Sequence, residues 1–483
     1  MADPKAFVSL PRIDIPKRSP AERKNDWKDL YRSLPIFTLQ GQAARCMDCG
    51  VPFCQADTGC PVQNLIPDWN ELVREDRWLD ALLSLHSTNN FPEFTGKLCP
   101  APCEQACVLG IIDEPVTIKS IEFSIVERGF DEGWVQPRPP AAETGRRVAV
   151  VGSGPAGLTA AQNLRRSGHG VTVFEKMDRL GGLLRYGIPD FKMEKWLIDR
   201  RLQQMEAEGV RFHTGVTIGE DLPLADLRRN FDAVCLAIGA EAVRPMTVSG
   251  ADLGGVHYAM EYLTQQNRVV AGDEIPEPQR IDAAGKRVVI IGGGDTASDC
   301  LGTAHRQGAE SVSQFILYPE PGEERDEATP WPYWPLKLME SHAHEEGGER
   351  EWSVVVTGFS GDARGRVAKL HAVRVEVERV PGTRSRIVPI PGTEFEVEVD
   401  LVLLAIGFVG PNRSAMIDSS ELALDARGNL FADASYRTSV EGVWAVGDAQ
   451  RGASLIVWAI REGRDAAADI DRWLATEELA RSA

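Results

Sequence analysis

Long apolar runs are missing from this sequence of 483 residues, and their absence narrows the classes of protein that it can encode. The longest such stretch, residues 401–409, is far shorter than the roughly 20 residues that a membrane-spanning helix needs. No positively charged segment followed by an apolar one opens the chain, so we expect a protein that is not secreted and stays in the cytoplasm.

Positive charge is also scarce. The chain carries 53 Lys and Arg against 71 Asp and Glu, a net charge of −18, which argues against nucleic acid or an anionic membrane as a partner. The first 45 residues differ, with nine Lys and Arg against five Asp and Glu. Residues 1–40 are polar and interrupted by proline, which predicts an extended basic arm, either docked on an acidic partner or free in solvent.

Cysteine is almost absent from three quarters of the chain. Only Cys235 and Cys300 occur there, on an expected strand and an expected helix, so we interpret both as buried packing thiols. The other seven cysteines lie between Cys46 and Cys107. In a long chain without a leader, this density favours bound metal over disulfides.

The residues that are present form successive blocks. In residues 41–136 the cysteines alternate with helical patterns, for example 68–83 and 118–126, which predicts a mainly α-helical domain. Prolines in residues 137–140 then predict a stiff linker. Two β-rich runs, 147–152 and 287–292, each open directly into a glycine turn and a helix. This repetition predicts an α/β fold with two Rossmann-like nucleotide-binding domains.

Two further strands suggest how those domains are connected. Residues 233–239 and 401–407 both end in Ala-Ile-Gly, and we expect these endings to mark the crossings between the domains. The first domain would then comprise residues 146–255 and 408–483, with a second domain, residues 256–407, inserted between its parts.

The first glycine turn has the form GxGxxG. Gly152 permits a tight turn, Gly154 lets the backbone approach a pyrophosphate, and Gly157 lets the following helix pack close to the strand. Glu175 ends the next strand, 23 residues after Gly152, where a carboxylate can accept both ribose hydroxyls of an adenosine. Strand, helix and acid together predict a dinucleotide site.

The second turn, residues 292–297, has the form GxGxxA and predicts a nicotinamide nucleotide site. The strand after it, residues 312–318, leads into Pro319-Glu320 rather than the arginine pair that would hold a 2′-phosphate, although Arg325 could substitute. These residues leave NADPH and NADH open. An unusual stretch follows at residues 319–351, which could be a lid, a docking loop or an aromatic plug packed on its own domain. We expect its His342 and His344 to be solvated.

The seven clustered cysteines follow the spacing of iron–sulfur ligands. In bacterial ferredoxins the last cysteine of a run belongs to the other cluster, and the same rule here divides them between two 4Fe–4S clusters. Cluster 1 would take Cys46, Cys49, Cys54 and Cys107, and cluster 2 would take Cys60, Cys99 and Cys103. Glu122 is our candidate for the eighth ligand, and a helix-surface glutamate is the alternative. Zinc is the competing metal, because CxxC pairs also suit tetrahedral sites.

The order of these motifs resembles the small (beta) subunits of bacterial glutamate synthase. The resemblance is carried by residues 45–54, 152–157 and 294–297 and by Gly447-Asp448. The same module forms the N-terminal part of dihydropyrimidine dehydrogenase, and its nucleotide-binding half is adrenodoxin-reductase-like. In that family NADPH reduces FAD, and electrons leave through the clusters to a large (alpha) subunit. That subunit carries FMN and glutaminase domains and makes two L-glutamate from L-glutamine and 2-oxoglutarate.

The resemblance implies the cofactor contacts. For FAD these are Gly152, Gly154, Pro155, Ala156, Gly157, Glu175, Gly182, Leu183, Lys192, Gly447 and Asp448. For NADPH, which it favours over NADH, they are Gly292, Gly294, Asp295, Thr296, Ala297, Ala405 and Gly407. No catalytic residue beyond the cofactors is implied.

Two other functions compete with this interpretation. One is the flavoprotein subunit of another cluster-containing reductase, of the ferredoxin:NADP oxidoreductase or sulfide dehydrogenase type. The other is a zinc-stabilised nucleotide-binding module without catalysis. The chain begins Met1-Ala2, so we expect no N-terminal cysteine nucleophile for glutaminase chemistry.

Overall fold

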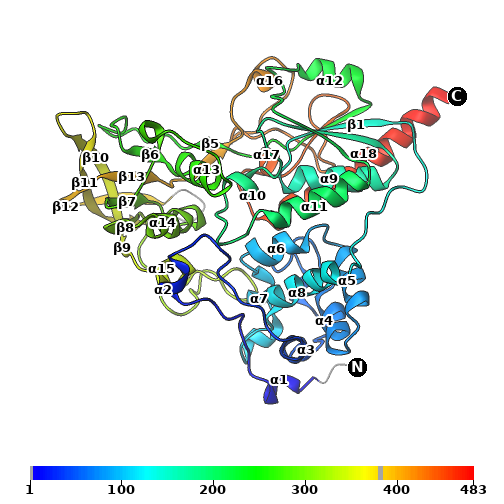
Figure 1. Cartoon of the computed structure of the whole chain (residues 1–483), viewed down its shortest axis with the longest axis horizontal. Helices are drawn as coiled ribbons and strands as arrows, with labels where there is room; N and C mark the ends of the chain where they lie inside the picture. The colour runs from blue at the N-terminus through cyan, green and yellow to red at the C-terminus, as the bar shows by residue number, and fades with distance from the viewer. Residues whose placement is uncertain (1–3, 379–384, 483) are drawn as a thin grey trace.

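The computed structural model describes residues 4–378 and 385–482, which form a helical domain and two sheet-containing domains (Figure 1). The helical domain is built around buried aromatic side chains, among them Trp69, Trp78 and Phe94. Its elements are α3 (Ile36–Ala44), η1 (Phe53–Gln55), α4 (Ile66–Arg74), α5 (Trp78–His86), α6 (Pro92–Leu98), α7 (Pro102–Gln105), η2 (Val108–Ile111) and α8 (Ile118–Asp131).

The helical pattern of residues 68–83 is two helices, not one. The chain breaks between α4 and α5 at Asp76, whose φ is +61°. The Asp76 carboxylate accepts a hydrogen bond from the Trp78 indole at 2.9 Å, a short-range interaction that competes with helix continuation. The pattern at residues 118–126 is one helix, α8, as expected.

The first sheet is parallel, in the order β15-β4-β1-β2-β3, and is covered on its two faces by helices. Strand β15 comes from the end of the chain, so residues on both sides of the second domain build one sheet. The strands are β1 (Arg147–Val151), β2 (Gly170–Glu175), β3 (Arg211–Thr214), β4 (Ala233–Leu236) and β15 (Val443–Ala445). The helices are α9 (Pro155–Arg166), α10 (Leu183–Tyr186), α11 (Trp196–Ala207), α12 (Leu224–Asn230), α16 (Ala415–Asp418), α17 (Asp448–Arg451) and α18 (Ile456–Ser482).

The second sheet is also parallel, in the order β6-β13-β7-β8-β9. Its strands are β6 (Val256–Tyr258), β7 (Arg287–Ile291), β8 (Ser311–Ile316), β9 (Glu349–Trp352) and β13 (Leu401–Leu404). Its helices are α13 (Ala259–Val270), η3 (Glu277–Gln279), α14 (Asp295–Gln307) and α15 (His342–Glu345). The α/β class with two Rossmann-like sheets is therefore confirmed. Cys235 on β4 and Cys300 on α14 are fully buried, as predicted.

Two further sheets complete the fold. An antiparallel sheet of β10 (Val354–Gly361), β11 (Val367–Glu378) and β12 (Arg386–Glu398) was not foreseen from the sequence. Strand β5 (Ala242–Val243) pairs with β14 (Phe408–Gly410), and these strands directly follow the two Ala-Ile-Gly endings. The outgoing and returning connections between the domains therefore lie side by side, as those endings suggested.

The N-terminal arm is neither free in solvent nor wholly extended. It contains α1 (Ala6–Ser9) and α2 (Pro20–Arg23), and α2 lies beside α15 of the second nucleotide domain (Figure 1). The side chains of Arg23 and Glu346 are fully buried and 2.6 Å apart, and Arg306 contacts the same carboxylate at 2.6 Å. The acidic group that part of this basic arm binds therefore belongs to the same chain.

The segment 319–351 also reaches across domains. Trp331 packs against Phe53 of the helical domain with ring centroids 4.7 Å apart, so the segment is not a plug confined to its own domain. Its two histidines are partly buried and not fully solvated as expected. Burial lowers the pKa of His342 to about 2 and that of His344 to about 4, and His344 hydrogen-bonds Gln314 at 2.7 Å.

Within residues 4–378 and 385–482, no helix combines the length and the apolar character that crossing a membrane requires.

Candidate functional site

The first glycine turn joins β1 to α9 with the geometry of a dinucleotide site. A Cβ at Gly152 would lie 2.3 Å from the carbonyl oxygen of Ala237, and one at Gly157 would lie 2.0 Å from that of Gly152. Gly154 differs, because a Cβ there would meet nothing within 4 Å. The turn therefore needs two glycines for its own packing and a third only to keep space free for a ligand.

That free space belongs to a cavity of about 500 Å³ between the domains. Eight of the residues predicted to contact FAD line it: Gly152, Gly154, Pro155, Ala156, Glu175, Gly182, Leu183 and Asp448. The start of α9 faces the same space, and its free N–H groups and positive dipole end suit a pyrophosphate. The residues present therefore fit FAD.

Glu175 is 4% exposed and is held by the turn itself. One of its oxygens accepts hydrogen bonds from the backbone N–H of Ser153 at 3.1 Å and from the Ser153 hydroxyl, and the other accepts from Met177 N–H at 2.9 Å. A carboxylate oxygen has two lone pairs, so the oxygen that accepts only from Met177 retains acceptor capacity toward a ribose hydroxyl.

Gly447 and Asp448 lie where α18 packs against the first turn. The N–H of Gly447 donates to the buried Glu462 carboxylate at 2.8 Å, and a Cβ at Gly447 would lie 2.9 Å from that of Ala156. Gly447 therefore packs behind the cavity, while Asp448 lines it. Burial raises the pKa of Asp448 to about 6, and its bonds to Ser454 oppose that rise. Glu462 carries no motif that would reveal this supporting role in the sequence.

Lys192 is not among the residues that line the cavity. Its ammonium group lies 2.8 Å from the carboxylate of Asp299 on α14, in the second nucleotide domain. The structure thus gives Lys192 a bridging position between the domains and does not bring it together with the other predicted FAD residues.

The second glycine turn repeats the first. Gly292 packs against Ala405, since a Cβ there would lie 2.2 Å from its carbonyl oxygen, whereas a Cβ at Gly294 would meet nothing within 4 Å. Ala297 is buried inside α14, Thr296 is the second residue of that helix, and Gly407 follows β13 with a φ of +88°. Asp295, the first residue of α14, lines the large cavity as well. The residues present fit a nicotinamide nucleotide whose site faces the flavin cavity.

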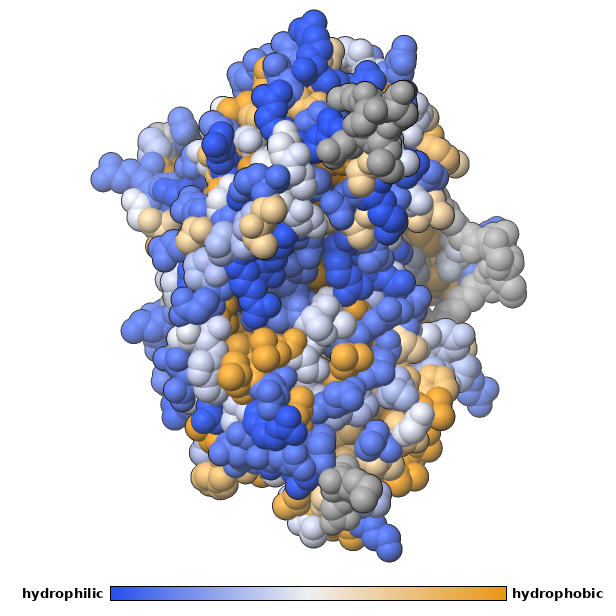
Figure 2. Space-filling view, turned by 90° about the vertical axis from the view of Figure 1, so that its right-hand side faces the viewer, coloured by the Kyte–Doolittle hydropathy of each residue, from blue (hydrophilic) through white to orange (hydrophobic). Residues whose placement is uncertain are grey.

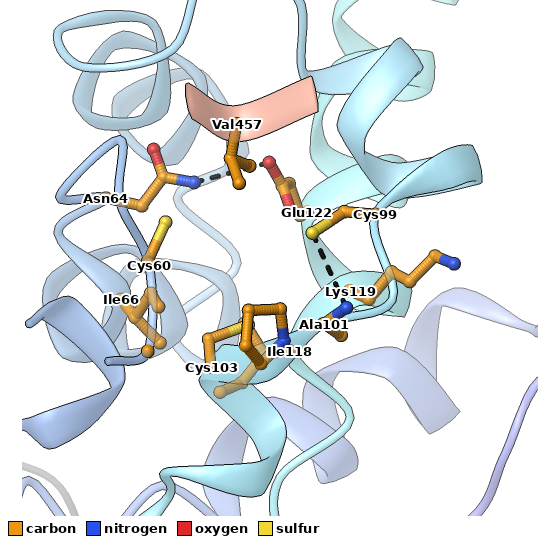
Figure 3. A pocket seen from close by; sticks show the side chains of 12 residues that line it. Cys60, Asn64, Ile66, Cys99, Ala101, Cys103, Ile118, Lys119, Glu122 and Val457 are labelled. Atoms are coloured by element: carbon orange, nitrogen blue, oxygen red, sulfur yellow. Dashed lines mark hydrogen bonds between the residues drawn. The ribbon is translucent and has the colours of Figure 1, made fainter. Parts of the chain in front are cut away.

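Cys60, Cys99, Cys103 and Glu122 line one small cavity in the helical domain (Figure 3). All three cysteines are buried, and Glu122 is 6% exposed, so the alternative of a helix-surface glutamate is wrong. Burial raises the pKa of Glu122 to about 7, against the effect of hydrogen bonds from Thr95, Asn89 and Asn64. The four groups predicted for cluster 2 thus converge from a loop, α6, α7 and α8.

Cys46, Cys49, Cys54 and Cys107 line a second cavity together with Met47, Phe53 and Leu109. Cys46 and Cys49 are partly exposed, whereas Cys54, Cys107 and the three thiols of the cluster 2 cavity are buried. Arg45 is 1% exposed, and its Nε and Nη1 have no hydrogen-bond partner among the described residues. Its Nη2 is paired, donating to the carbonyl oxygen of Glu114 at 2.7 Å and lying 3.6 Å from the carboxylate of Asp113, so the two free donors fit a negatively charged group held by the next residue, Cys46.

Four thiols around one cavity, and three thiols with a carboxylate around the other, suit iron–sulfur clusters. Burial raises the pKa of most of these thiols, for example to about 12 for Cys46 and Cys60, so thiolates there need a compensating positive charge such as bound iron. Across the part of the chain that the structure describes, no three His, Cys, Asp or Glu side chains are grouped to hold a single metal ion.

The cluster 2 cavity adjoins the flavin cavity. Leu98 and Pro100, which flank Cys99, line the flavin cavity, and Ile456 and Val457 of α18 line the flavin cavity and the cluster 2 cavity respectively. Arg464 of α18 also donates to the carbonyl oxygen of Thr88 at 2.5 Å. Sequence reasoning missed these connections, because Leu98 and Val457 carry no motif and the segments that contain them come together only in the folded chain.

Comparisons with known proteins agree with this geometry. Residues 146–463 match the family described as pyridine nucleotide-disulphide oxidoreductase, and residues 23–134 match the domain described as dihydropyrimidine dehydrogenase domain II, 4Fe-4S cluster. The FprA protein of Mycobacterium tuberculosis, solved in complex with NADPH, is 19% identical and shares the fold (TM-score 0.57, over 70% of this chain and 86% of FprA). The protein is therefore an FAD- and NAD(P)H-dependent oxidoreductase with an iron–sulfur domain.

The relatives narrow that class. A glutamate synthase (NADPH) small chain of M. tuberculosis is 55% identical over 98% of this chain and 96% of the relative. The one of Bacillus subtilis is 44% identical over 98% and 99%. The glutamate synthase (NADH) of Schizosaccharomyces pombe is 45% identical over 97% of this chain, but the match covers only 22% of that protein. The chain belongs to the family of glutamate synthase small chains.

Proposed function

We propose that this chain oxidises NADPH and delivers the electrons to a large glutamate synthase subunit, which makes two L-glutamate from L-glutamine and 2-oxoglutarate. FAD accepts two electrons together as a hydride, and 4Fe–4S clusters carry electrons one at a time. The chain's own part is to hold the nucleotide through Gly292–Ala297, the flavin through the Gly152–Gly157 turn with Asp448, and the two clusters through seven cysteines and Glu122.

The observation that carries this proposal is the adjacency of the cavities. The flavin cavity is lined by Asp295 of the second nucleotide domain and by Leu98 and Pro100 on either side of Cys99. A nicotinamide and a cluster therefore approach the flavin site from different domains, which is the arrangement that electron transfer from NADPH to iron requires.

NADPH is the nucleotide that we propose, because the bacterial small chains are named for it. The yeast relatives are named for NADH, so the choice between NADPH and NADH depends on the residues of the second nucleotide site. Arg325, the sequence candidate for the 2′-phosphate, instead donates to the carbonyl oxygens of Thr329 and Tyr333 at 3.1 and 2.6 Å. Its guanidinium retains further donors for a phosphate.

We expect the purified chain to reduce artificial dyes with NADPH and to form no glutamate from glutamine and 2-oxoglutarate. None of the sites described above supplies a nucleophile for glutamine or a second flavin. Adding a large subunit with FMN and glutaminase domains should produce glutamate, measured by the amino acid released per NADPH consumed. Cys49→Ser should impair this reconstitution more than direct dye reduction. Glutamate made by the chain alone would contradict the proposal, and failure to bind any synthase subunit would favour the ferredoxin-type reductase.

We propose that electrons leave this chain for the large subunit through cluster 1. Its Cys46 and Cys49 are partly exposed, and apolar side chains near its ligands are strongly exposed: Val51 by 63%, Ile111 by 58% and Ile112 by 69%. Apolar side chains, orange in Figure 2, gather in the lower half of that view. On the helical domain, α5 exposes Leu79 by 44% and Leu83 by 46%. Exposed apolar surface around a redox centre is typical of a protein interface.

Ile112→Glu should therefore weaken binding of the large subunit at least about tenfold, since a charge buried at an interface without a partner costs more than about 1.4 kcal/mol. Binding can be measured by titration of the two purified subunits. The matched control is Phe431→Glu, which introduces the same charge at an exposed apolar position (47%) outside the helical domain. Equal affinity of the Ile112 variant and the native chain would exclude this exit surface.

A further inference from the structure

The cluster 2 cavity contains a buried polar network whose members are not themselves metal ligands. From its geometry we infer that Thr95, Asn89 and Asn64 are positioning residues, which orient Glu122 so that a single carboxylate oxygen faces cluster 2. This inference rests on the proposed ligation of that cluster by Cys60, Cys99, Cys103 and Glu122.

The three side chains all donate to the same oxygen of Glu122. Its Oε1 accepts from the Thr95 hydroxyl at 2.7 Å, from Asn89 Nδ2 at 2.9 Å and from Asn64 Nδ2 at 3.3 Å. They come from α6, from the loop before it and from the loop before α4, so the carboxylate is held from three directions. All three donors are neutral and buried or nearly so.

The side-chain amides of Asn89 and Asn64 are oriented with the nitrogen, and not the oxygen, toward Glu122. Asn89 Oδ1 accepts from the backbone N–H of Phe91 at 3.0 Å, and an N–H can only donate, so the Asn89 amide nitrogen must face Glu122. Asn64 Oδ1 is similarly occupied by the hydroxyl of Thr88 at 2.8 Å. Asn89 Nδ2 also donates to Thr95 Oγ1 at 2.8 Å, which directs the Thr95 proton to the carboxylate.

The other oxygen, Oε2, accepts no hydrogen bond from the residues that the structure describes. Glu122 lines the cavity with the three thiols, and Figure 3 shows its carboxylate beside Cys99. With Oε1 accepting three hydrogen bonds, Oε2 is the oxygen left to bind a cation, and a positive charge there would offset the cost of burying the carboxylate, as Lys119 of the same cavity does in part. Iron at the eighth cluster position would supply such a charge. The network thereby converts a flexible side chain into a ligand of defined orientation, which is the usual role of residues behind a metal ligand.

Thr95→Val tests the role of the network, because valine has the shape of threonine and lacks only the hydroxyl. With one donor lost, Oε1 carries more negative charge, so the reduced and more negative cluster becomes less stable. We expect a more negative midpoint potential for one cluster, an altered EPR spectrum of that cluster after reduction, and iron loss to a chelator at least about tenfold faster. Thr95→Ser, which restores the hydroxyl, should return all three to the native values. Asn64→Ala, which removes the longest of the three bonds, should shift them less.

The matched control is Thr303→Val, the same change at a buried threonine of α14, outside both cluster cavities, whose hydroxyl donates to the carbonyl oxygen of Asp299 at 2.7 Å. It should leave both potentials unchanged. Native potential and spectrum in Thr95→Val, or no recovery in Thr95→Ser, would overturn the inference. Glu122→Ala separates this failure from failure of the ligand assignment, since it should remove about half of the iron if Glu122 is a cluster ligand. Full iron content in Glu122→Ala would exclude that assignment itself.

Discussion

Gly154→Val is expected to yield a folded protein without FAD. The backbone at residue 154 has φ −70° and ψ 179°, which any residue adopts, and its Cβ would meet no protein atom within 4 Å. The side chain would instead occupy the space between the backbone and the pyrophosphate. A clash that costs about 4 kcal/mol weakens binding about a thousandfold, so purified protein should lose its flavin absorbance and its NADPH oxidation.

The measurement is the flavin content after purification, together with the thermal unfolding of the apoprotein. Gly41→Val is the control, because Gly41 lies in α3, a Cβ there also meets nothing within 4 Å, and residue 41 does not line the flavin cavity. It should retain full flavin. A Gly154 variant with native flavin occupancy would show that this turn does not hold the cofactor.

Gly294→Val should produce the complementary defect. Residue 294 has φ −96° and ψ −174° and is equally open, and it precedes α14 as residue 154 precedes α9. We expect native FAD content, reduction of that FAD by dithionite, and loss of its reduction by NADPH. Stopped-flow absorbance at saturating NADPH measures the effect, which should reach at least about a hundredfold on the same steric grounds.

The two glycine variants together test whether the sites are separate. Each should affect one nucleotide and spare the other, so each serves as the control of the other. Loss of FAD from the Gly294 variant, or dithionite-resistant flavin in it, would mean that the two turns do not bind different nucleotides.

Much of the fold followed from local patterns. A strand, a glycine turn and a helix interact within about 30 residues, so residues 147–175 and 287–316 could be read as two Rossmann-like units. The antiparallel sheet β10–β12 was missed although residues 373–378 and 394–398 alternate apolar and charged side chains, because it is an insertion that the Rossmann-like pattern does not contain. The break between α4 and α5 was missed since it depends on one residue, Asp76, adopting a positive φ.

Residues that act through distant neighbours were beyond sequence reasoning. His342 and His344 lie among glutamates, which suggested exposure, yet both are partly buried, and residues of α2 and β8 hydrogen-bond the His342 carbonyl oxygen and the His344 ring. Lys192 was grouped with the FAD residues by resemblance, whereas the structure pairs it with Asp299 of the other domain. Leu98 and Val457 show the same limit, because their position between two cavities depends on how three domains pack.

The sequence by itself determined the class of protein. Two nucleotide-binding turns, seven clustered cysteines and an acid in α8 indicate its redox chemistry, and each of these motifs consists of residues that are close together along the chain. Tertiary structure decided how those parts are joined. It placed Cys99 beside the flavin cavity, sorted the thiols around two cavities, and surrounded Glu122 with Thr95, Asn89 and Asn64. The physical reason is range, since motif geometry is set by backbone bonds between near neighbours, whereas burial, pairing and orientation depend on contacts between residues far apart in the chain.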